Sequence, residues 1–169
     1  VEVERAEAEL RQSEEEYREL YKQSKRAEEL YQSLINSSAD AIVIYDLEGK
    51  ATYVSEAFTR MFGWTKEEVV GKRIPFVPES ELDASLEGIA NLIRDGKPVS
   101  GFETRRNTKD GRVLDVSVSS SRFHDHEGNP AGILVILRDI TAWKSMDRAR
   151  KRAVSHLSHE LTTPLAIVG

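Results

Sequence analysis

The first 35 residues constrain the fold most strongly, because they contain no glycine or proline and are rich in Glu, Arg, Ala and Leu, which favour helix. A single four-three spacing selects ten positions in this segment, and eight of them are apolar or aromatic. The ten are Val3, Ala6, Leu10, Ser13, Tyr17, Leu20, Ser24, Ala27, Tyr31 and Leu34. This pattern predicts a helix over residues 1–35 that pairs as a two-stranded coiled coil. A lone charged helix stays open as the alternative, because the Ser and Ala positions weaken the seam.

The hydrophobic period changes after Asn36-Ser37-Ser38. Two continuous apolar runs follow, AIVIYD from Ala41 and GILVILRDI from Gly132, and each indicates a strand that is buried on both faces or central in a sheet. A short strand is predicted near residues 50–54, and two more flank the hairpin turn Lys109-Asp110-Gly111. The sequence therefore predicts five strands, with the first and fifth side by side at the centre.

Helical segments separate the second and third predicted strands. Two short helices end at Gly63 and Gly71, and a longer one spans Ser80–Arg94. The longer helix carries its predicted buried stripe at Leu82, Leu86, Ile89 and Ile93. This order of elements predicts an α+β domain, a five-stranded antiparallel sheet with helices on one face and a further helix at each end of the chain.

The middle of the chain resembles the PAS sensor family. The matching residues are SSADAIVIYDLEGKATYVSEAFTRMFGWTKEEVVGKR, residues 37–73, together with RDIT at residues 138–141. The resemblance implies a PAS domain over residues 36–141, folded as predicted above. Ser55 stands where the family commonly has Asn, so any helix capping at this position falls to Ser55.

PAS domains can hold haem, flavin or small metabolites, so the resemblance raises the question of a ligand. The sequence has no cysteine for a covalent flavin adduct and no histidine in the Ser80–Arg94 helix for the haem of oxygen-sensing relatives. A noncovalent ligand between sheet and helices stays possible, with walls at Phe58, Met61, Trp64, Ile89 and Phe102. An apolar core without any ligand is an equal alternative, and the identity of a ligand is left unknown.

A second helical segment begins at Ala142 and contains SHELTTPL, residues 158–165. Its apolar stripe runs through Val154, Leu157, Leu161, Leu165 and Val168, after a looser heptad of Trp143, Met146, Arg150, Ala153 and Leu157. At about 100° per residue, His159 points away from Leu157 and Leu161 and therefore into solvent. Pro164 removes the backbone hydrogen bond to the Glu160 carbonyl, which predicts a bend beside His159.

Residues 154–169, VSHLSHELTTPLAIVG, resemble the H-box of histidine kinases, the first helix of their dimerisation and phosphotransfer domain. The resemblance implies that His159 is the phosphoacceptor, Glu160 its acid/base, and Thr163 a residue that positions water for dephosphorylation. The residue types suit this chemistry, because a largely neutral imidazole has a free lone pair and a carboxylate can fix its tautomer. His156 lacks a following Glu and is interpreted as structural or incidental.

Other candidate sites are weak. His124 and His126 flank Asp125 in a predicted hairpin, where such residues are usually solvated, so no metal site is expected. The net charge of −5 gives no reason to expect a nucleic-acid partner, because nucleic-acid binding normally needs a basic face. The lack of cysteine fits a reducing cytoplasm, and no apolar run reaches the roughly 20 residues needed to span a bilayer, so any anchor is expected upstream in the parent protein.

The sequence thus predicts the sensor and phosphoacceptor portion of a cytoplasmic part of a two-component histidine kinase. We expect a homodimer through the N- and C-terminal helices, with residues 1–35, 36–141 and 142–169 as signalling helix, sensor and H-box segment. The resemblance implies that ATP and Mg²⁺ belong to a kinase domain of the parent protein and that a response regulator receiver domain takes the phosphoryl group, so no cofactor is expected in this portion. A non-enzymatic PAS module that dimerises or binds a ligand is the alternative.

Overall fold

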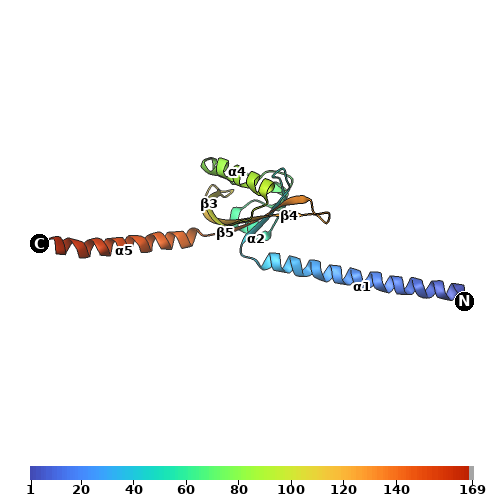
Figure 1. Cartoon of the computed structure of the whole chain (residues 1–169). Coiled ribbons are helices and arrows are strands. Elements are labelled where there is room, and N and C mark those ends of the chain that lie inside the picture. The colour runs from blue at the N-terminus through green and yellow to red at the C-terminus, as the bar shows by residue number, and fades with distance from the viewer. Residues whose placement is uncertain (168–169) are drawn as a thin grey trace. The chain divides into compact units, whose positions relative to one another are not determined.

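The N-terminal segment is one continuous helix, α1 (Glu2–Ser37). The computed structural model of the chain describes residues 1–167, with side chains described through residue 162 (Figure 1). Residues Val1–Ser38 form a unit of their own, and none of the α1 side chains is buried within it. The predicted seam residues Tyr17 and Leu20 are 76% and 62% exposed. The helix is confirmed, and its pairing stays a prediction.

The second unit begins at Ala39 and is built on a single sheet of five antiparallel strands. The strands are β1 (Ala41–Tyr45), β2 (Ala51–Val54), β3 (Val99–Asn107), β4 (Val113–His124) and β5 (Pro130–Asp139). Their order is β2-β1-β5-β4-β3, so the predicted pairing of the first and fifth strands is confirmed. The predicted α+β fold with a five-stranded sheet is confirmed as well.

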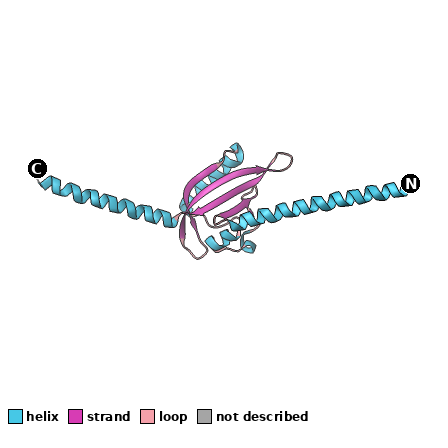
Figure 2. Ribbon diagram, turned by 90° about the horizontal axis from the view of Figure 1, so that it is seen from below, coloured by secondary structure: helices cyan, strands magenta, loops and turns pink. Residues whose placement is uncertain are grey.

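The connection from β2 to β3 carries three helices, α2 (Glu56–Phe62), α3 (Lys66–Val69) and α4 (Glu79–Asp95), and α4 lies behind the sheet in Figure 2. Gly63 ends α2 as predicted, and its backbone has the left-handed conformation with φ of 87°. Ser55 caps the start of α2, since its Oγ accepts hydrogen bonds from the backbone N–H of Phe58 at 3.3 Å and of Ile42 at 3.0 Å. The α3 helix ends at Val69, two residues before the predicted stop at Gly71.

The hydrophobic core lies on the helix side of the sheet. The rings of Phe58, Phe62 and Phe76 pack with centroids 5.2 to 6.1 Å apart. They lie against buried strand residues such as Val43 and Val116.

The opposite face of the sheet is less covered. There β1 and β5 present four apolar side chains that are only half-buried, Ile42, Ile44, Leu134 and Ile136. Among the residues that the structure describes, these two strands are therefore not fully buried on both faces, and their continuous apolar runs reflect the central position of β5 and its neighbour β1 instead.

The α4 helix has the predicted extent but not the predicted orientation. Leu82 and Leu86 are 42% and 47% exposed, so the predicted buried stripe is wrong at these positions. The side chain that α4 buries is Leu92, and the sheet-facing side also includes Ser85 and Gly88. Small residues on that face leave space under the helix.

The C-terminal helix α5 (Thr141–Ile167) follows β5 after a single residue. The Asp139 carboxylate accepts a hydrogen bond from the Thr141 backbone N–H at 2.9 Å, which fixes the first turn. The backbone is helical through Pro164. Within the described part of the chain, none of the helices combines the length and apolar character that a bilayer crossing requires.

Candidate functional site

A cavity of about 320 Å³ lies between α4 and the inner face of the sheet. Two of the predicted wall residues, Ile89 and Phe102, line it. The other three do not: Phe58 is fully buried, and Met61 and Trp64 pack against the same core cluster. The prediction was therefore right about the location between sheet and helices but wrong for these three walls.

The most unusual residue of the cavity is Arg106, a buried arginine in β3 that sequence reasoning missed. Its Nη1 donates to the Arg105 carbonyl at 2.7 Å and to Thr104 Oγ1 at 3.2 Å, and its Nη2 donates to Ser85 Oγ on α4 at 3.1 Å. The guanidinium carbon lies 5.5 Å from the centre of the Phe76 ring. Strand alternation could have found this residue, because Phe102, Thr104 and Arg106 share one face of β3.

Burial shifts the pKa values of two titratable side chains that line the cavity, Arg106 and Tyr45. It lowers the pKa of the Arg106 guanidinium, although Tyr45 and Glu81 act in the opposite direction. It raises the pKa of the Tyr45 phenol strongly, partly offset by Arg106. Tyr45 is therefore neutral at physiological pH, whereas Arg106 keeps its charge because a guanidinium is so strongly basic.

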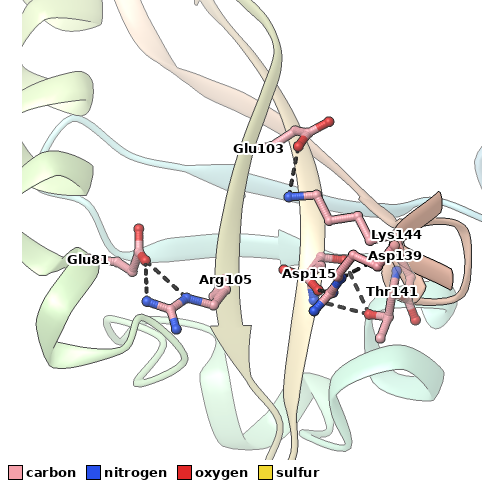
Figure 3. Close-up of polar contacts among 8 residues, drawn as sticks. Glu81, Glu103, Arg105, Asp115, Asp139, Thr141 and Lys144 are labelled. Atoms are coloured by element: carbon pink, nitrogen blue, oxygen red, sulfur yellow. Dashed lines mark hydrogen bonds and ion pairs between the residues drawn. The ribbon is translucent and has the colours of Figure 1, made fainter. Parts of the chain in front are cut away.

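A polar contact at the edge strand holds α4 to the sheet (Figure 3). The Glu81 carboxylate of α4 accepts hydrogen bonds from Arg105 Nε at 3.1 Å and Nη2 at 2.9 Å, and from Thr104 Oγ1 at 2.9 Å. These bonds, first those from Arg105 and then that from Thr104, lower the pKa of Glu81 below its ordinary value of 4.5. Glu81 is consequently ionised wherever this contact is formed.

Asp115 of β4 joins the sheet to α5. Its backbone N–H donates to Thr141 Oγ1 at 3.0 Å, its carbonyl accepts from the Ile140 N–H at 2.9 Å, and its carboxylate lies 3.0 Å from Arg148 Nη2. Lys144, also on α5, pairs with Glu103 of β3 at 2.8 Å (Figure 3). The first two turns of α5 are thus tied to the two strands that face α4.

The predicted phosphoacceptor His159 lies exposed on α5, and Glu160 is exposed as well. The Glu160 carboxylate lies 3.1 Å from Nε2 of His156, four residues earlier. This pair forms because positions i and i+4 share a helix face, whereas adjacent positions diverge. The interpretation of His156 as structural or incidental is compatible with this exposed contact on its own helix. Thr163 belongs to α5 by its backbone, but its side chain lies outside the described residues.

The predicted apolar stripe of α5 is exposed at the positions whose side chains the structure describes. Leu157 and Leu161 are 58% and 71% exposed, and Val154 is 58% exposed. The expected burial of Leu157 and Leu161 is therefore not provided by the described part of this chain. Leu165 lies outside the residues whose side chains are described.

The family model described as PAS fold matches residues 29–140. The chain belongs to the PAS family. It is 29% identical over 133 residues to the sensor protein kinase WalK of Staphylococcus aureus (strain Newman), covering 79% of this chain and 21% of that protein. The WalK protein of Staphylococcus saprophyticus is also 29% identical over 133 residues, with 20% of its length covered. The chain thus spans about a fifth of these relatives and contains a PAS domain related to those of sensor histidine kinases.

Solved structures show the same fold. The PAS domain of a protein from Colwellia psychrerythraea superposes with a TM-score of 0.58 at 24% identity, covering 73% of this chain and 98% of that one. An RNA-binding light-oxygen-voltage receptor gives a TM-score of 0.63 at 20% identity, covering 75% of this chain and 36% of that one. At these identities the likeness concerns the fold alone.

Proposed function

We propose that this chain is the sensor and phosphoacceptor portion of a two-component histidine kinase. The observation that carries the proposal is the exposed His159 of the SHELTTPL sequence, on a helix that leads directly out of the PAS sheet. The relation to the WalK kinases supports the same class. The proposal divides the chain into residues 1–35, 36–141 and 142–169 and places it in the cytoplasm, where ATP is available.

In the proposed reaction a ring nitrogen of His159 attacks the γ-phosphorus of ATP, a nitrogen–phosphorus bond forms and ADP leaves. A separate kinase domain of the parent protein supplies ATP and Mg²⁺. Glu160 acts as the acid/base beside His159, and Thr163 positions water for the dephosphorylating reaction. A response regulator receiver domain accepts the phosphoryl group.

The ion pairs around β3 and β4 suggest how the sensor reaches α5. Arg105 stands directly opposite Asp115 in the strand pair, where side chains can interact. At present Arg105 pairs with Glu81 of α4, and Asp115 pairs with Arg148 of α5. When α4 moves away from β3, Arg105 loses Glu81 and competes with Arg148 for Asp115. In a homodimer joined by its terminal helices, release of Arg148 shifts or rotates the output helices.

A non-enzymatic PAS module that dimerises or binds a ligand is the competing function. The cavity under α4 and the contact of Glu160 with His156 favour it. Both observations are compatible with a helix that never meets ATP.

Phosphorylation of the parent kinase distinguishes the two functions. With radiolabelled ATP, His159→Gln should abolish the acid-labile label of a phosphohistidine, whereas the matched control His156→Gln should keep it. The control removes an exposed imidazole from the same helix, and glutamine can still contact Glu160. Label that persists in His159→Gln, or that depends on His156, contradicts the assignment.

A further inference from the structure

The cavity under α4 contains a buried positive charge without a matching negative one. Arg106 is only 7% exposed, and its Nε has no hydrogen-bond partner among the described residues. No carboxylate of the described part of the chain lies within ion-pairing distance of its guanidinium, as all of its hydrogen bonds go to neutral oxygens. An unpaired buried charge strongly disfavours folding, so a charge in this position needs an anion nearby.

The surroundings of Arg106 compensate this charge only in part. The Phe76 ring offers its face at 5.5 Å, and a cation over a ring recovers only a fraction of the lost hydration. The Tyr45 phenol is neutral, and Glu81 already accepts bonds from Arg105 and Thr104. The charge of Glu81 acts on Arg106 without a direct contact, so an anion from outside the protein would complete the compensation.

The cavity also restricts what such an anion can be. Among its described lining residues, only Tyr45, Ser85, Arg106 and Ser120 have polar side chains. A phosphate monoester carries up to two negative charges, whereas Arg106 is the single cation among these described lining residues, so the lining matches one negative charge better. A volume of about 320 Å³ holds about ten non-hydrogen atoms, if each takes the roughly 30 Å³ share of a water molecule.

We propose that the cavity binds a small carboxylic acid with an apolar body, whose carboxylate pairs with Nε and Nη2 of Arg106. A guanidinium offers two parallel N–H groups on this side, which match the two oxygens of a carboxylate. The apolar body lies against residues such as Ile89, Leu92 and Val118.

Binding of the carboxylate changes how α4 is held. Nη2 of Arg106 now donates to Ser85 of α4, and the carboxylate competes for this donor. Occupancy therefore weakens this polar contact between α4 and β3, whereas the contact of Glu81 with Arg105 and Thr104 is left in place. The effect on phosphorylation rests on the proposed function, whereas the binding itself does not.

Titration of the ¹⁵N-labelled chain with matched probes tests the proposal. Octanoate and phenylacetate each have about ten non-hydrogen atoms, and phenylacetamide has the shape of phenylacetate without its charge. The carboxylates should cause saturable shifts of backbone amide signals in α4 and β3, and phenylacetamide should bind at least tenfold more weakly. Arg106→Met should lose carboxylate binding. Arg112→Gln, which removes an exposed arginine from the β3–β4 turn, should keep it.

Three outcomes overturn the proposal: equal binding of phenylacetate and phenylacetamide, full carboxylate binding by Arg106→Met, or no saturable shift at millimolar concentrations of either acid. If Arg106→Met fails to fold, the comparison of acid and amide on the unaltered chain still decides. Failure of this experiment leaves the phosphorylation of His159 untouched, because that reaction is measured separately.

Discussion

At the scale of single residues, Ser55 joins β1 to α2 through one hydroxyl oxygen. That oxygen accepts the N–H groups of Phe58 and Ile42, and Ser55 is itself 1% exposed. Ser55→Ala leaves both donors without this acceptor, so it should lower the free energy of unfolding by about 2 kcal/mol. Urea unfolding measures the change. Ser80→Ala, an exposed serine in α4, should stay within about 0.5 kcal/mol; an equal loss in both variants contradicts the role of Ser55.

The residue scale also shows what the sequence could and could not predict. The capping that falls to Ser55 in place of the Asn common in the family is present in the structure. The buried Arg106 was missed because a charged residue in a strand is expected on the solvent face, and only the alternation of β3 contradicts that expectation. The contact of Glu160 with His156 was missed because the motif directs attention to the adjacent His159, while helix geometry favours position i−4.

At the scale of elements, the contact of α4 with β3 should depend on pH through Glu81. The pKa of Glu81 is lowered in the folded chain, so its contribution to stability is fully present above its ordinary pKa of 4.5 and is lost as the pH falls through the lowered value. Glu81→Gln should remove this dependence. Urea unfolding at pH 6 and at successively lower pH should show a smaller acid loss in Glu81→Gln than in Glu79→Gln, an exposed neighbour in the same turn. Identical slopes in the two variants contradict the assignment.

Elements were predicted more reliably than their orientations. Continuous apolar runs identified β1 and β5 as neighbours, and glycine located the end of α2. The rotation of α4 was not predictable from apolar spacing, because the helix turns its small residues Ser85 and Gly88 towards the sheet and leaves Leu82 and Leu86 exposed. The spacing of apolar residues predicts which helix face is most apolar, and it therefore cannot predict a helix whose small residues face a cavity.

At the scale of the whole molecule, each terminal helix leaves apolar side chains uncovered. Leu10, Leu20 and Leu34 of α1 are 60%, 62% and 59% exposed, and Trp143 and Leu157 of α5 are both 58% exposed. Scattered apolar residues are normal on a protein surface, but those of α1 recur at the heptad spacing that predicts a coiled coil. A second copy of the chain is therefore the partner expected along α1.

Self-association of the chain tests this expectation directly. Leu20→Glu introduces a charge into the α1 seam of both copies and removes the two leucines that pairing would bury, each contributing roughly 1.5–3 kcal/mol. The dimer dissociation constant should therefore rise at least about a hundredfold in sedimentation equilibrium. Gln32→Glu adds the same charge to an exposed position of α1 outside the seam and should leave the constant nearly unchanged. A Leu20→Glu chain that dimerises normally would show that α1 is a solitary helix. The signal would then have to pass between subunits through α5 alone.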